Sequence, residues 1–132
     1  VALDEGVTVI AAHACSYGLI LYEKFLPTLH DLVQRYPHFY ADISALTLPN
    51  RLRMLLHLRN YPQVHERLLF GTDYPLPVFH LAAWGRVAMG RLRQLILTKN
   101  RFDRQVDVCQ GLQVGFRSIG DLIPHASGQT PH

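Results

Sequence analysis

Three short apolar segments, separated by longer stretches with helical periodicity, most constrain the fold of this chain. These segments predict strands near residues 7–12, 39–44 and 67–71. The stretches between them predict helices near 20–35 and 51–60. Strands that alternate with helices in this way favour a βαβαβ arrangement with parallel strands and right-handed crossovers. The sequence therefore predicts an α/β fold.

The alternation stops after Pro77, and the rest of the chain predicts helices. Their expected bounds are near 79–98, 103–112 and 114–122, with Asp103 as a candidate cap. The tail at 125–132 is polar and contains Gly and Pro, so we expect it to be disordered. Residues 1–124 are then expected to form one domain, which suits a chain of 132 residues.

Each predicted strand ends in a polar side chain. His13 follows the first strand, Asp42 and Ser44 end the second, and Asp73 follows the third. Because the carboxyl ends of parallel strands meet at one edge of a sheet, these residues predict a site there. Two alternatives remain: Asp73 forms only a turn with its own backbone, and His13 is a partly buried histidine bonded to a carbonyl group.

Composition and charge exclude several classes of protein. With 48% hydrophobic and 17% charged residues, the chain is globular in composition, and no apolar run reaches the roughly 20 residues that span a bilayer. Without such a run we expect no membrane partner. The net charge of +3 is mild, and aromatic residues are not interleaved with the basic ones, so we expect no nucleic-acid partner. No secretory signal precedes the first strand, and two distant cysteines form no disulfide framework. A cytoplasmic location is therefore expected.

Four segments carry a resemblance to a known family. They read VTVIAAHACSYG, FYADISAL, RLLFGTDYPLP and NRFDRQVDVCQGL. Together they resemble the amidohydrolase superfamily, in its amidohydrolase-2 branch of metal-dependent hydrolases and decarboxylases. The resemblance implies the C-terminal part of a TIM-type (β/α)₈ barrel, with the three predicted strands in the places of strands six to eight.

The same resemblance implies roles for His13 and Asp73. Asp73 matches the aspartate that binds the catalytic metal and accepts a proton from the attacking water, and His13 matches the histidine that orients or polarises water or substrate. The metal is expected to be zinc, with manganese or iron as alternatives. The implied reaction is attack of metal-activated water on an amide, ester or lactone of a small molecule. Asp42 and Ser44 match no ligand position and are expected to support the site.

The chain also departs from the family pattern. It lacks the His-x-His pair of the first strand and the ligand of the fifth strand, and it carries Ala14, Cys15 and Ser16 where glycines are usual. It begins with Val1 at about the place where strand six begins. We therefore expect the C-terminal part of a larger barrel that is inactive alone. Either the chain is truncated, or its missing strands come from disordered sequence, from another chain or from a different local fold. The expected protein partner is a second copy, as in a homo-oligomer, or the missing half of the barrel.

Three other functions stay open from sequence alone. A decarboxylase uses the same scaffold, and a partial barrel without activity can serve as an interaction module. A Rossmann-like or flavodoxin-like binding domain also fits βαβαβ, but the chain has no G-x-G-x-x-G after its first strand.

Overall fold

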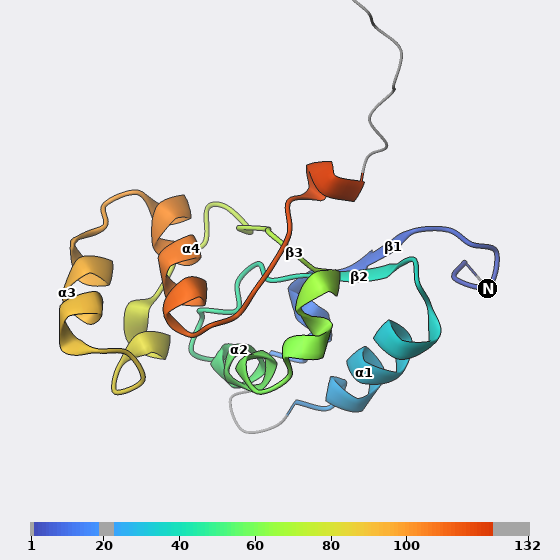
Figure 1. Cartoon of the computed structure of the whole chain (residues 1–132), viewed down its shortest axis with the longest axis horizontal. Coiled ribbons are helices and arrows are strands. Elements are labelled where there is room, and N and C mark those ends of the chain that lie inside the picture. The colour runs from blue at the N-terminus through green and yellow to red at the C-terminus, as the bar shows by residue number, and fades with distance from the viewer. Residues whose placement is uncertain (1, 19–22, 123–132) are drawn as a thin grey trace, which may run out of the picture.

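A computed structural model describes residues 2–18 and 23–122, which form an α/β fold around an open parallel sheet (Figure 1). The sheet has three strands, and they are β1 (Val9–Ala11), β2 (Phe39–Asp42) and β3 (Leu68–Leu69) in that spatial order. The register pairs Ile10 with Tyr40 and Asp42 with Leu69. The prediction of parallel strands is confirmed. Over the described residues the sheet is open and not closed into a barrel.

Two crossover helices cover one face of this sheet. Helices α1 (Leu26–Arg35) and α2 (Leu52–Arg59) both lie below it in Figure 1. The side chains of β2 alternate accordingly, with Phe39 and Ala41 buried and Tyr40 and Asp42 only partly so. Leu29 of α1 and Leu55 of α2 belong to the same buried core as Phe39. Burial of this apolar layer drives the two crossovers onto the sheet.

Local signals explain where two of the helices begin. Helix α1 begins at Leu26 with Pro27 in its first turn, where a missing N–H costs nothing. The predicted start near 20 is therefore too early, and residues 19–22 lie outside the described part. Helix α4 (Arg101–Gly111) begins before the predicted residue 103, because Asn100 and not Asp103 is its cap: the Asn100 side chain accepts the Phe102 N–H at 2.8 Å.

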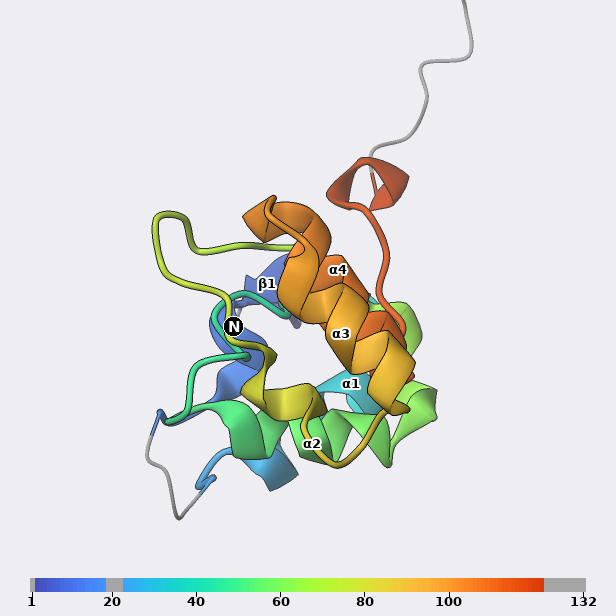
Figure 2. The same ribbon diagram turned by 90° about the vertical axis from the view of Figure 1, so that its left-hand side faces the viewer.

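The single helix predicted near 79–98 is wrong. A short 3₁₀ helix, η3 (His80–Ala83), is followed by a turn and then by α3 (Met89–Leu97). Gly85 in the turn has a φ of +67°, a left-handed conformation that ends a right-handed helix. Helices α3 and α4 pack together at the end of the molecule opposite the N-terminal residues (Figures 1 and 2).

The helix predicted near 114–122 is also wrong in its first part. Gln113 has a φ of +60° just after α4, and the chain then runs alongside β3. The Phe70 N–H donates to the Arg117 carbonyl at 2.8 Å, and the Arg117 N–H donates to the Leu68 carbonyl at 2.8 Å. This segment satisfies the outer edge of β3, and a short 3₁₀ helix, η4 (Ile119–Leu122), follows it within the described residues.

The strand predicted near 67–71 is shorter than expected. A 3₁₀ helix, η2 (Pro62–Arg67), precedes β3 and brings the chain to the sheet. A second short helix, η1 (Ala12–Cys15), replaces the end of the strand predicted near 7–12. The predicted tail at 125–132 lies outside the described residues. Among the helices of the described part, none has the length and apolar character needed to cross a bilayer.

Candidate functional site

The first polar residue of the candidate site, His13, stands in an unusual turn at the end of β1. His13, Ala14 and Cys15 have φ values of 54°, 50° and 61°, so three successive residues with side chains are left-handed. The Ser16 N–H donates to the His13 carbonyl at 2.8 Å and closes the turn. Such conformations cost about 1–2 kcal/mol per residue, so contacts elsewhere must stabilise this turn.

Asp42 supplies one of those contacts. Its Oδ1 atom accepts the His13 N–H at 3.0 Å and the Ser44 N–H at 2.9 Å, and it also accepts the Ser44 hydroxyl. Ser44 is only 5% exposed, so its hydroxyl has little access to water. One carboxylate oxygen thus joins the ends of β1 and β2. The sequence placed Asp42 in a supporting role but gave no sign that it binds the His13 backbone.

The His13 ring is fixed by Ser44 on one side and faces Asp73 on the other. Its Nδ1 lies 2.9 Å from Ser44 Oγ and 3.1 Å from the Ser44 carbonyl oxygen. A carbonyl oxygen only accepts, so this pattern assigns the proton of the neutral ring to Nδ1. The lone pair is then on Nε2, which lies 3.7 Å from Asp73 Oδ2. Two acceptors face each other, an arrangement that suits a shared proton, a water molecule or a cation between them.

Asp73 reaches this position because of the backbone around it. Gly71 precedes it, and a Cβ atom there would lie 3.3 Å from the Cβ atoms of both Asp42 and Ser44. Asp73 itself has a φ of +53°, and the Leu76 N–H donates to its carbonyl at 3.0 Å. The turn is therefore closed by backbone atoms, while the carboxylate, whose side chain is 42% exposed, faces His13.

The structure thus brings His13, Asp42, Ser44 and Asp73 together, as the sequence predicted for one edge of the sheet. The alternative interpretation of His13 also holds in part, because Nδ1 bonds a carbonyl group.

Gln105 of α4 is a residue of this region that the sequence analysis missed. It is 2% exposed, and its Nε2 donates to the Gly71 carbonyl at 2.6 Å and to the Ile43 carbonyl at 3.3 Å. It thereby joins the chain segments that leave β2 and β3. A sequence signal was present: Gln105 is spaced by three, four and seven residues from the buried Val108, Cys109 and Leu112.

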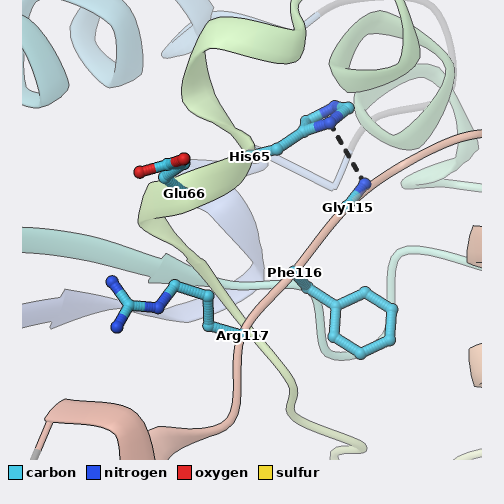
Figure 3. A pocket seen from close by; sticks show the side chains of 5 residues that line it. All are labelled: His65, Glu66, Gly115, Phe116 and Arg117. Atoms are coloured by element: carbon cyan, nitrogen blue, oxygen red, sulfur yellow. Dashed lines mark hydrogen bonds between the residues drawn. The ribbon is translucent and has the colours of Figure 1, made fainter.

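A concave region elsewhere on the molecule carries no comparable chemistry. It has a volume of about 470 Å³ and is lined by His65, Glu66, Gly115, Phe116 and Arg117 (Figure 3). His65 Nδ1 accepts the Gly115 N–H at 3.1 Å, and His65 Nε2 lies 2.9 Å from the Leu58 carbonyl oxygen, to which it donates. Both ring nitrogens are therefore occupied, and His65 holds the 115–117 segment against η2.

A pair of histidines joins the two crossover helices. His30 Nε2 of α1 and His57 Nε2 of α2 are 3.0 Å apart, and the His57 ring stacks on Tyr61 at 4.2 Å between centroids. Such a contact is an N–H···N hydrogen bond, which requires one of the two nitrogens to be unprotonated. Burial, with a smaller contribution from the charge of His30, lowers the pKa of His57 from its ordinary 6.5.

The site at the ends of β1 and β3 contains two possible metal ligands. Asp73 Oδ2 and His13 Nε2 present lone pairs to a common space, as two ligands of one metal ion do. Over residues 2–18 and 23–122, however, no three His, Cys, Asp or Glu side chains are grouped closely enough to hold a metal ion. The described residues thus supply part of a metal site and do not complete one.

Comparison with known proteins adds no further assignment. No family model, curated protein or solved structure matches this chain. Any functional conclusion therefore depends on the geometry of these residues and on the motifs that hold them.

Proposed function

We propose that this chain is the C-terminal part of a metal-dependent hydrolase of amidohydrolase type, with β1, β2 and β3 in the places of barrel strands six to eight. The observation that carries the proposal is the facing pair of acceptors, His13 Nε2 and Asp73 Oδ2, 3.7 Å apart beyond the ends of β1 and β3. The carboxyl ends of parallel strands are where barrel enzymes place their catalytic groups. The motif RLLFGTDYP supplies the family resemblance.

In this proposal each residue of the site has a separate role. The partly exposed carboxylate of Asp73 accepts a proton from an attacking water molecule. His13 Nε2, unprotonated in the assigned tautomer, accepts a hydrogen bond from that water or from a polar group of the substrate. Asp42 and Ser44 fix the position and the tautomer of His13. A bound zinc ion, or manganese or iron in its place, would lower the pKa of its water toward neutrality, with Asp73 as one of its ligands.

The substrate class follows from this chemistry. Water attack suits an amide, an ester or a lactone of a small molecule, and a decarboxylase on the same scaffold is the nearest variant. Because the described residues contain no group of three ligands, the remaining ligands must come from residues outside the described part, from a second copy or from another chain. We expect the 132-residue chain alone to show no hydrolysis above background.

The test requires the whole reading frame. Reading the coding sequence upstream of the Val1 codon and expressing the complete protein should give stoichiometric metal by elemental analysis, together with metal-dependent hydrolysis in a screen of esters, lactones and amides. Asp73→Asn should remove both the metal and the activity. Asp31→Asn is the matched control, because Asp31 is an exposed carboxylate of α1 that pairs with Arg35.

Two results would contradict the proposal. One is a complete protein that binds no metal and is unaffected by Asp73→Asn, which would leave a non-catalytic interaction module. The other is robust metal-dependent turnover by the 132-residue chain alone, which would contradict the incomplete site.

A further inference from the structure

The connection between β3 and α4 has a charge unlike the rest of the chain. Residues 74–102 include five of the 13 basic residues and none of the ten acidic ones. The basic residues are Arg86, Arg91, Arg93, Lys99 and Arg101. A strong local excess of one charge on an otherwise mildly charged protein favours a partner of the opposite charge.

The same connection exposes apolar side chains. Of the 14 large hydrophobic residues that are exposed in the described part, nine lie between Tyr74 and Phe102. Met89 is 77% exposed, Leu97 67% and Trp84 61%. Single exposed apolar residues are common, but a concentration of them marks a surface that binds something.

Helix α3 presents the most regular part of this surface. Leu92 and Leu95 are buried against the body of the molecule, while Met89, Ile96 and Leu97 are exposed on the other side. Arg93 lies on the same side by helical spacing, and these side chains line a shallow hollow of about 460 Å³. Figure 2 shows α3 at the front of the molecule, in front of α4. The exposed side of α3 therefore forms the surface of the molecule at the end farthest from the N-terminal residues.

Most of the positive charge around α3 is not neutralised. Arg91 pairs with Asp107 at 3.3 Å. The other four basic residues form no ion pair with any residue of 2–18 or 23–122, and two of them, Arg86 and Arg101, bond only to backbone carbonyl groups of Trp84 and Pro75. Arg93, which lines the hollow of α3, therefore has no ion-pair partner among residues 2–18 and 23–122.

We propose that the exposed side of η3 and α3 docks onto an anionic lipid surface. Apolar side chains that protrude from a short helix, with Arg and Lys beside them, are the chemistry of interfacial membrane contact, in which long cationic side chains extend to the lipid head groups. The sequence-based expectation of no membrane partner rested on the lack of a spanning segment. Surface docking needs no such segment.

The charge and shape of this surface disfavour three other binding partners: a second copy of the chain, nucleic acid and an acidic helix. A second copy would bring two basic connections together, and their like charges would repel. Nucleic acid is bound by aromatic side chains on which its bases stack, whereas the hollow of α3 is lined by Met89, Ile96 and Leu97 and by no aromatic residue. An acidic helix from another protein normally needs a groove between elements, whereas the hollow here is lined by residues of α3 alone.

Vesicle binding tests the proposal independently of any hydrolase activity. The full 132-residue chain would be sedimented with vesicles of phosphatidylcholine and phosphatidylglycerol at low salt, and Trp84, the single tryptophan, would report contact through its fluorescence. We expect binding that weakens steeply with added salt, a shift of Trp84 emission to shorter wavelength, and little binding to pure phosphatidylcholine.

Matched pairs of variants separate this surface from the rest of the chain. Ile96→Gln with Leu97→Gln should weaken binding by at least about tenfold, because two apolar side chains no longer enter the lipid. Their control is Val7→Gln with Ile119→Gln, also exposed apolar residues. Arg93→Gln with Lys99→Gln should weaken binding by about fivefold per charge. Their control is Lys24→Gln with Arg59→Gln, basic residues outside 74–102.

Several outcomes would overturn the proposal. They are no binding to the anionic vesicles at low salt, equal binding to pure phosphatidylcholine, and unchanged binding by the Ile96→Gln, Leu97→Gln variant. Binding of a fluorescein-labelled amphipathic peptide rich in Glu and Leu, without any vesicle binding, would assign the surface to an acidic protein instead.

Discussion

Removing the carboxylate of Asp42 is the perturbation whose effect follows most directly from the structure. In Asp42→Ala, the N–H groups of His13 and Ser44 and the hydroxyl of Ser44 lose a common charged acceptor. The Ser44 hydroxyl is buried, so water does not readily replace the acceptor. The left-handed turn after β1 also loses the contact that joins it to β2.

The expected loss of stability can be worked from these contacts. A hydrogen bond to a charged group contributes about 1.5–3 kcal/mol, but three bonds to one oxygen are not independent. We therefore expect Asp42→Ala to lower the free energy of unfolding by about 3–5 kcal/mol, a large part of the 5–15 kcal/mol typical of a domain. Asp42→Asn keeps an acceptor oxygen without its charge and should cost about 1–2 kcal/mol.

Urea unfolding of the purified chain measures these losses, provided that the m-value, the slope of the free energy of unfolding against urea concentration, is the same for each variant. The double variant Asp42→Ala, Ser44→Ala should be less destabilised than the sum of the single variants by more than about 1 kcal/mol, because the two side chains share a bond. Asp31→Ala serves as a control for loss of an exposed carboxylate. A loss below about 1 kcal/mol in Asp42→Ala, or strict additivity with Ser44→Ala, would refute the central role of Asp42.

Three further predictions concern buried or partly buried groups. Because burial and the charge of His30 lower the pKa of His57 in the folded state, the unfolded state binds a proton at this residue more readily. The free energy of unfolding should therefore fall as the pH drops below about 6.5. His57→Asn should flatten this pH dependence, whereas His38→Asn, at an exposed position, should leave it unchanged. Gln105→Leu should lower the free energy of unfolding, measured in urea, by about 1–3 kcal/mol, because two backbone carbonyls lose their donor. This value allows for the gain from removing the buried Oε1 atom, which has no hydrogen-bond partner. A variant as stable as the original chain would contradict the prediction. Burial raises the pKa of the Cys109 thiol to about 12, so a thiolate-directed reagent should modify it only on unfolding; rapid labelling of Cys109 in the native chain, distinguished from the partly exposed Cys15 by peptide mapping, would count against the assigned burial.

The sequence predicted the parallel sheet well because the signal is local and repeated. The first two apolar segments are each followed by a helical stretch of crossover length, and Pro27 lies in the first turn of α1, as its chemistry favours. The position of His13 and Asp73 at one edge followed from strand direction alone. These are properties that periodicity and proline chemistry determine.

The errors arose where distant contacts decide the local structure. Residues 114–117 have a helix-like pattern, but the unpaired edge of β3 holds them extended. The left-handed turn at His13 contains no glycine, so its sequence gives no hint of its conformation; the bond to Asp42, 29 residues away, stabilises it. Gln105 was passed over because a polar residue within an apolar pattern indicates a buried hydrogen bond only once its partners are known.

The pairing of Arg117 with β3 has a consequence for any assembly of this chain into something larger. Leu68 and Phe70 offer one set of backbone hydrogen bonds on their outer side, and the chain's own C-terminal segment already takes it. A strand arriving from elsewhere to close a barrel would compete for the same two groups and would have to displace that segment. Closure at β3 would then be an exchange of one strand for another, whereas a strand added beside β1 would displace nothing that the described residues contribute.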